Sequence, residues 1–229
     1  MNNSQLPQGK LARVVFTRTF VFVFLLLAIL FLSAGTFAYW EAWVYFGIIL
    51  VPMISFLIFL LKTNPELLER RMRVREKQAE QKFIVIIGSI IFFLVFLLPG
   101  FDKRFRWSEV PMEMVIVADI FVLLSYLMIF LVLRENRYAS RIIEVERDQE
   151  VISTGPYAIV RHPMYLGASL MYLFSPLALG SYWAIIPSFL MIPVFVARIR
   201  NEEKILEREL KGYQKYMQKT KYRLVPGIW

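Results

Sequence analysis

The sequence contains no cysteine and a single histidine, His162. The absence of cysteine excludes disulfide bonds, thiolate nucleophiles and cysteine-ligated zinc. With only one histidine, a metal site built from several imidazoles is also impossible, so we predict no bound metal. The Gly-x-Gly-x-x-Gly fingerprint of dinucleotide-binding folds is absent as well. Any chemistry must therefore come from other side chains on a different kind of fold.

Charge is missing from long stretches of the chain. Hydrophobic residues make up 58% of the 229 residues, whereas soluble domains have about 45–50%. The excess is concentrated in uncharged runs that alternate with short charged segments. This pattern predicts an all-α, polytopic membrane bundle with about five to six membrane segments. Four long runs and two weaker ones carry the pattern: 19–38, 42–61, 83–99, 112–133, 164–179 and 182–197.

The first and the last runs need separate interpretation. The first follows basic residues, as in a signal peptide, but it is too long for a signal-peptide core and more runs follow, so we interpret it as a retained helix. The last two are joined by Gly180-Ser181 and interrupted by Pro176, Pro187 and Pro193. They are either two tilted spans or a hairpin that dips into the bilayer, which is tolerated where broken helices line a cavity.

The net charge of +9 raises the alternative of nucleic-acid binding. However, the basic residues other than those of the loop 103–106 fall at the ends of apolar runs, in the first 18 residues or in segments 62–82, 134–162 and 198–229. If every run crosses, these segments share one side, and the positive-inside rule places both termini in the cytoplasm. We therefore predict a multi-pass protein with membrane lipids, and not nucleic acid, as partners.

A short helix is predicted after the second run. Asn64 can cap it, and Pro65 suits its first turn. The simplest interpretation is an amphipathic helix that lies on anionic lipid. The role of the whole basic segment, 64–82, stays open at this stage.

Residues that could bind a ligand or take part in catalysis are densest in 151–167, where a charged segment enters the fifth run. Here Pro163 restricts His162 to extended backbone and suits the start of a helix, whose N-terminus can help to hold an anion. After the hairpin, Arg198 and Glu202 are four residues apart, so they share a helix face and can pair. Each feature alone has an ordinary structural explanation. Together, at the two ends of one hairpin, they indicate a site at one membrane face.

Four motifs resemble those of the isoprenylcysteine carboxyl methyltransferase family, to which phospholipid N-methyltransferases are related: Gly155-Pro156-Tyr157, Arg161-His162-Pro163-Met164-Tyr165, Arg198 with Glu202-Glu203, and Gly212-Tyr213-Gln214-Lys215-Tyr216. The resemblance is strong over 149–229 and looser upstream, where the chain looks like bacterial members. The length and the lack of a linker predict one structural domain, with transmembrane helices and cytoplasmic loops in 1–148 and, as the resemblance implies, a methyltransferase region in 149–229. A bacterial-type member would lie in the inner membrane.

The resemblance also implies S-adenosyl-L-methionine as methyl donor, bound without a Rossmann fold. His162 with nearby helix amides would bind its methionyl carboxylate, Glu202 its ribose hydroxyls and ammonium, and a tyrosine face its sulfonium. Arg198 and Glu202 are the implied catalytic residues, and Arg198 would orient an anionic acceptor. The implied cofactor-binding residues are Gln149, Glu150, Val151, Ile152, Tyr157, His162, Pro163, Met164, Tyr165 and Glu202.

The methyl acceptor stays open among an isoprenylcysteine-like carboxylate or thiol, a phospholipid amine and a small thiol. Leu210-Lys211-Gly212-Tyr213 departs from the phenylalanine-glycine element of the family, which disfavours a prenyl-cysteine substrate. Two other classes compete with a methyltransferase. A transporter would require interrupted segments in both halves, whereas only one such pair is found. A non-catalytic membrane scaffold would not need His162, Arg198 and Glu202.

Overall fold

The computed structural model describes residues 7–73 and 79–229, and every regular element in these ranges is helical. The predicted all-α architecture is confirmed. The basic segment 62–82 is described only in part, because residues 74–78 lie outside the described ranges. In chain order, the helices are α1 (Gln8–Ala34), α2 (Trp40–Thr63), α3 (Pro65–Arg71), α4 (Ala79–Phe105), α5 (Met112–Glu135), the 3-10 helix η1 (Gly155–Ala158), α6 (Pro163–Ala178), α7 (Ile185–Glu209) and α8 (Tyr213–Lys219).

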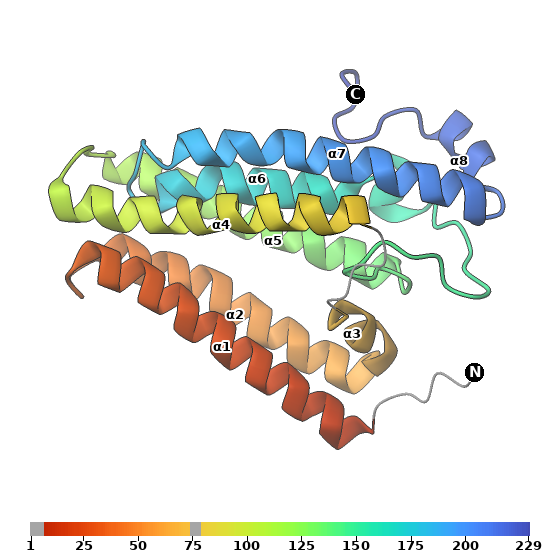
Figure 1. Cartoon of the computed structure of the whole chain (residues 1–229), viewed down its shortest axis with the longest axis horizontal. Helices are drawn as coiled ribbons and strands as arrows, with labels where there is room; N and C mark the ends of the chain where they lie inside the picture. Colours follow the sequence, from red (N-terminus) through yellow and green to blue (C-terminus); the bar gives the residue numbers. More distant parts are fainter. Residues whose placement is uncertain (1–6, 74–78) are drawn as a thin grey trace.

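The long helices run back and forth along one axis (Figure 1). The connections 35–39, 106–111 and 179–184 lie at one end, which we call the tryptophan end. The other end, called the motif end, holds α3, the loop 136–162 and α8. The described basic segments therefore reach the same end, as the charge pattern predicted. Helices α1, α2 and α5, together with Glu80–Phe105 of α4, are long and apolar enough to span a membrane, as expected of an integral membrane protein.

Helices α6 and α7 form the predicted hairpin. Pro176 lies inside α6 and Pro193 inside α7, so both prolines are accommodated without ending a helix. The backbone of α6 comes close to α5 at Gly167, where an added Cβ would lie 2.9 Å from Ile129 Cγ1 and 3.2 Å from the carbonyl oxygen of Ser125. Only glycine permits this approach. Helix α7 extends past its apolar part and carries its polar C-terminal half to the motif end.

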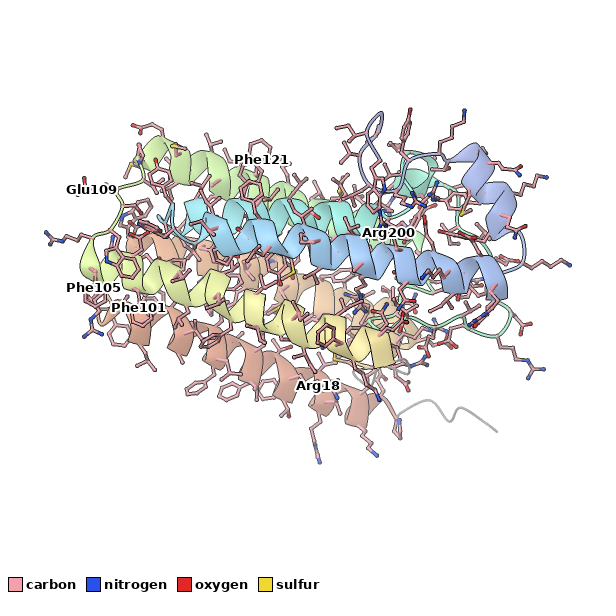
Figure 2. All side chains as sticks on the ribbon, turned by 45° about the horizontal axis from the view of Figure 1, so that its top comes forward. Arg18, Phe101, Phe105, Glu109, Phe121 and Arg200 are labelled. Carbon is pink, nitrogen blue, oxygen red and sulfur yellow. The ribbon has the colours of Figure 1, made fainter. Side chains whose placement is uncertain are left out.

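The core draws on all six long helices. Leu30, Tyr45, Val95, Val122 and Leu179 are almost completely buried in it. Many large apolar side chains instead project outward along the middle of the bundle (Figure 2), as contact with lipid requires. Figure 2 also labels the polar ends: Arg18 and Arg200 lie toward the motif end, and Glu109 lies at the tryptophan end.

Helix α3 begins as predicted but faces the protein. The Asn64 side chain accepts a hydrogen bond from the Leu67 backbone N–H at 3.1 Å, which is an N-cap. Leu67 and Leu68 are 1% and 0% exposed, packed in a cluster with Leu60 and Leu133. The interpretation of this segment as an amphipathic helix lying on lipid is therefore wrong for α3, because its apolar face packs against α1 and α2.

The tryptophan end is closed by its own polar contacts. Buried Asp102 accepts hydrogen bonds from the backbone N–H of Ser108 at 2.8 Å and from the hydroxyl groups of Ser108 and Ser181. Lys103 pairs with Glu41 at 2.8 Å. These contacts join the connections 106–111 and 179–184 to α4, and the start of α2 to the end of α4. Four tryptophans lie here with about half of their surface exposed, which is typical of residues at a membrane–water interface: Trp40, Trp43, Trp107 and Trp183.

Candidate functional site

A cavity of about 690 Å³ opens at the motif end and continues between α4, α6 and α7. The cavity is polar at the motif end and apolar further along the helices. Its polar wall includes Arg71, Asn136, Ser140, Arg141, Glu144, Gln149, Glu150, Tyr157, His162, Tyr165, Arg198, Glu202, Tyr213 and Tyr216, and its apolar wall includes Phe22, Ile84, Val85, Phe92, Ile129, Tyr172, Met191, Val194 and Phe195. One space therefore offers both a charged and a hydrocarbon-like surface.

The cavity brings together nearly all of the predicted site residues. Gln149, Glu150, Val151, Ile152, Tyr157, His162, Met164, Tyr165, Arg198 and Glu202 all line it. Pro163 is buried at the first position of α6 and is not part of the wall. Its contribution is to start the helix beside His162. The predicted convergence of the two ends of the hairpin is thus a feature of the structure, whereas the chemical role of each residue stays a prediction.

Tyr165 connects the two residues that were expected to pair with each other. The Arg198 Nε–H donates to the Tyr165 hydroxyl at 3.0 Å, and this hydroxyl donates to Glu202 Oε2 at 2.8 Å. Arg198 also donates to the carbonyl oxygen of Arg141 at 2.8 Å. The guanidinium and the carboxylate are consequently fixed in orientation on one wall of the cavity by a shared tyrosine.

Glu203, next to Glu202 on α7, turns away from the cavity and is only 2% exposed. It accepts hydrogen bonds from Arg161 Nε at 2.7 Å and Arg223 Nε at 2.6 Å, and its Oε1 lies 3.2 Å from His162 Nε2. Burial alone would raise the pKa of Glu203, but the hydrogen bonds from His162, Arg161 and Arg223 outweigh it and lower the pKa to about 2. Taken alone, a glutamate pair on a helix suggests two solvated side chains, and for Glu203 this expectation is wrong.

The C-terminal tail holds the loop that carries His162. The backbone N–H of Arg161 donates to Tyr222 O and that of His162 donates to Arg223 O, both at 2.9 Å. The Arg161 guanidinium adds bonds to the carbonyl oxygens of Thr220 and Lys221. The backbone of His162 and both the backbone and the side chain of Arg161 are therefore fixed by the C-terminal tail. The sequence motifs alone gave no sign that residues 220–223 take part.

The surroundings of His162 are well defined, whereas its expected role toward a ligand carboxylate stays a prediction. Its ring is 4% exposed, with Nε2 against Glu203 and Nδ1 3.9 Å from Glu202 Oε1. The contact to Glu203 at 3.2 Å orients the imidazole ring, whereas 3.9 Å to Glu202 is too long for a hydrogen bond. The same surroundings favour a cationic group or hydroxyl donors beside Glu202.

The other side of the polar wall is aromatic. The Tyr157 hydroxyl accepts from Asn136 Nδ2 at 2.9 Å, and the Tyr216 hydroxyl donates to the carbonyl oxygen of Tyr157 at 2.7 Å. Tyr213 is 4% exposed, and its hydroxyl has no hydrogen-bond partner among the described residues. Burial raises the pKa of Tyr213, and Glu203 and Glu202 raise it further, so the hydroxyl stays protonated. Buried hydroxyl groups normally have a hydrogen-bond partner, and a ligand in the cavity could supply one for Tyr213.

Three of the residues on the tyrosine side of the cavity, Asn136, Tyr213 and Tyr216, were not among the predicted site residues. Tyr213 and Tyr216 lie in a motif that had been recognised, so the signal for them was present. Asn136 lies at the end of α5 and carries no comparable signal. The described part of the chain holds no group of three or more metal-ligating side chains.

Comparison with known proteins finds a family that matches part of the chain. No curated protein matches the chain. A family model does match over residues 113–212, which run from the start of α5 to the glycine before α8. This stretch contains His162, Arg198 and Glu202 but not Arg71 or the C-terminal tail. The family that it matches is described as phospholipid methyltransferase, a family of methyltransferase enzymes.

Proposed function

We propose that this protein is an integral membrane methyltransferase that uses S-adenosyl-L-methionine and methylates a lipophilic acceptor. The observation that carries the proposal is the two-part cavity, which joins the matched motif residues to an apolar space between membrane helices. A polar nucleoside donor and an apolar acceptor need these two surfaces side by side. The fit of the donor is supported by the unpartnered Tyr213 hydroxyl and by the Glu202 carboxylate, both at the polar wall.

In this proposal, the polar wall holds the donor. Glu202, oriented by Tyr165, accepts hydrogen bonds from ribose hydroxyls or the ammonium group. Tyr157 and Tyr213 offer aromatic faces and a hydroxyl to the base and to the sulfonium. The backbone of residues 149–152 completes this side of the wall. Together these residues would bind the ammonium, carboxylate and sulfonium groups of the donor without a glycine-rich loop.

Bound in this place, S-adenosyl-L-methionine supplies an electrophilic methyl group on a sulfonium, and an anionic acceptor can take it without a strong base. The protein then has two tasks: to hold the acceptor atom and the methyl carbon in line at about 3–3.5 Å, and to exclude water. Arg198 is placed for the first task, since Tyr165 and the Arg141 carbonyl fix its guanidinium. The buried helix walls perform the second.

We place the motif end in the cytoplasm because the basic segments gather there, and a bacterial inner membrane is the corresponding bilayer. The donor would enter from the cytoplasm. The acceptor would arrive from the bilayer toward the apolar wall, where Phe22 of α1 is 38% exposed. Isoprenylcysteine-like carboxylates, phospholipid amines and thiols all remain candidate acceptors.

Calorimetry with S-adenosylhomocysteine tests this function on detergent-purified protein. We expect saturable binding to the wild type and a loss of roughly tenfold or more in affinity for Glu202→Ala, because a charge-assisted hydrogen bond is removed. Glu207→Ala, at an exposed position of the same helix, is the matched control and should bind normally. A wild-type protein that does not bind would refute the donor assignment.

A labelled-methyl assay with lipids and thiols then tests the reaction. Transfer that is lost in Arg198→Ala supports the acceptor role of Arg198, whereas full turnover in that variant would show the role to be wrong. Binding of the donor analogue without transfer to any acceptor would favour a membrane scaffold.

A further inference from the structure

Arg71 lines the cavity, although it belongs to none of the sequence motifs and lies outside the matched residues 113–212. It is the last residue of α3. Its Nη1 donates to the carbonyl oxygen of Ser140 at 3.2 Å and contacts Met164 Sδ at 3.6 Å. Both partners are neutral, and the guanidinium forms no ion pair with a described residue. A partly buried cation without a balancing charge is costly unless it serves a site.

The neighbouring arginines have carboxylate partners. Arg70 lies 3.6 Å from Glu66 and 3.5 Å from Glu146, and Arg73 also pairs with Glu146. In Arg71, by contrast, Nη1 makes both of the contacts named above, and the Nε–H and Nη2 groups have no partner in the described part of the chain. These two groups form one edge of the guanidinium, which can bind a carboxylate through two parallel hydrogen bonds.

The hydroxyl of Tyr157 is a further hydrogen-bond donor at the same wall. Burial raises the pKa of this hydroxyl, and the hydrogen bond from Asn136 does not offset the effect, so the hydroxyl stays protonated. It accepts from Asn136 Nδ2 at 2.9 Å, while Asn136 Oδ1 accepts from the backbone N–H of Tyr138 at 2.9 Å. The second contact fixes the orientation of the amide. The Tyr157 O–H therefore has no acceptor among the described residues and can donate to a ligand.

Arg71 and Glu202 present opposite charges to this part of the cavity. Both charges act on the Tyr157 hydroxyl, in opposite directions. Tyr165 also interacts with both residues, since it acts electrostatically on Arg71 and donates to Glu202 Oε2 at 2.8 Å. The methionyl group of the proposed donor carries an ammonium and a carboxylate on one carbon atom. Such a group needs an anion and a cation of the protein close together, and this wall provides them.

We propose that Arg71 and the Tyr157 hydroxyl bind the carboxylate of the methionyl group of the donor, while Glu202 binds its ammonium. This inference rests on the proposed function, because it assigns residues to one group of the proposed donor. Among the predicted cofactor-binding residues only His162 can carry a positive charge, and its Nε2 faces Glu203 at 3.2 Å. Helix α3 then contributes a specificity-determining residue, which selects nucleosides that carry an α-amino acid.

Calorimetry of the full chain in detergent tests the assignment with two probes. They are S-adenosylhomocysteine, which carries the same α-amino acid group, and its decarboxylated analogue, which keeps the ammonium. We expect the wild type to bind S-adenosylhomocysteine at least roughly tenfold more tightly than the analogue, because the analogue lacks charge-assisted hydrogen bonds. Arg71→Gln should weaken S-adenosylhomocysteine by roughly tenfold and leave the analogue within about twofold. Unchanged binding of the analogue also shows that this variant is folded.

Three further variants sharpen the test. Arg71→Lys keeps the charge but loses the planar edge, so it should retain part of the preference for S-adenosylhomocysteine. Glu202→Ala should weaken both probes to the same extent, because both keep the ammonium, and should leave the preference intact. Arg70→Gln is the matched control, because Arg70 lies on the same helix and does not line the cavity. It should bind both probes like the wild type.

Other results would overturn the assignment. Equal affinity of the wild type for the two probes would remove the carboxylate site. A preference that persists in Arg71→Gln and is lost in His162→Asn would return the carboxylate to His162. An equal loss of both probes in Arg71→Gln would give Arg71 a structural role only, and a loss of methyl transfer with unchanged probe binding would place it with the acceptor. Wild-type protein that binds neither probe would refute the proposed function itself, whereas normal S-adenosylhomocysteine binding by Arg71→Gln would refute the role of Arg71 alone.

Discussion

The two ends of the bundle both bury a carboxylate, and they use it differently. At the tryptophan end, the hydrogen bonds that Asp102 accepts from described residues come from the neutral groups of Ser108 and Ser181. At the motif end, Glu203 is surrounded by Arg161, His162 and Arg223. The first arrangement joins two connections to the end of α4 and lies outside the cavity wall. The second forms the back of a wall whose front, with Glu202 and Tyr213, is open to a ligand. The comparison teaches that a rigid charged layer can support a binding surface one residue away on the same helix.

The largest effect is expected for Glu203→Ala. This change leaves Arg161 and His162 buried beside an empty position, and breaking a buried ion pair in this way costs about 3–5 kcal/mol. We expect a large fall in the thermal unfolding midpoint and loss of S-adenosylhomocysteine binding. Glu207→Ala, exposed on the same helix, should change stability by less than about 0.5 kcal/mol. A Glu203→Ala protein as stable as this control would show that the charged layer is not structural.

Acid should produce a smaller version of the same effect, because it removes the charge and keeps the side chain. The pKa of Glu203 is lowered from 4.5 to about 2 in the folded protein. Its contribution to stability is therefore fully present above about pH 4.5 and is lost as the pH falls toward 2. Thermal unfolding midpoints measured over this range should fall less steeply for Glu203→Gln than for the wild type. Identical slopes would contradict the assignment.

Asp102→Ala tests the tryptophan end. Loss of the carboxylate leaves the donors of Ser108 and Ser181 without their partner, which costs about 1–3 kcal/mol. Since this end is remote from the cavity, donor-analogue affinity should be unchanged when binding is measured well below the lowered unfolding midpoint. A matching fall in affinity would mean that the two ends are coupled and that Asp102 contributes to the binding surface as Glu203 does.

The smallest effect is expected for Tyr213→Phe. The hydroxyl has no partner among the described residues, so its removal should not lower the unfolding midpoint. If the donor satisfies this hydroxyl, the affinity for S-adenosylhomocysteine should fall by about 0.5–1.5 kcal/mol, the usual value of one hydrogen bond. Calorimetry on both proteins measures the difference. Lowered stability with unchanged affinity would make Tyr213 part of the packing only.

Much of the fold could be predicted because its signals are local. Apolar runs, their prolines and the basic segments follow one another along the chain, and they fix the direction of each pass. The position of His162 at the start of α6 follows from Pro163. The same local signals place Arg198 and Glu202 on one helix face, and the hairpin then brings all three together.

The rest of the site depends on contacts between distant segments, which leave no periodic trace in the sequence. Arg71 reaches the cavity from α3, and the tail carbonyls of residues 220–223 hold the loop before α6. The burial of Glu203 could not be distinguished from the partial exposure of Glu202, because adjacent residues on a helix differ only by which neighbour each faces. The orientation of α3 was predicted wrongly for the same reason.

The hydroxyl of Tyr165 accepts from Arg198 and donates to Glu202 at the same time. In the proposed roles, one oxygen atom thereby joins the recognition of the acceptor to the recognition of the donor. A substitution at position 198 intended to alter substrate choice would release this hydroxyl and disturb the neighbouring carboxylate as well. Selectivity for the proposed donor and the proposed acceptor is therefore not expected to evolve independently, and redesign of one binding surface would need a compensating change in the other.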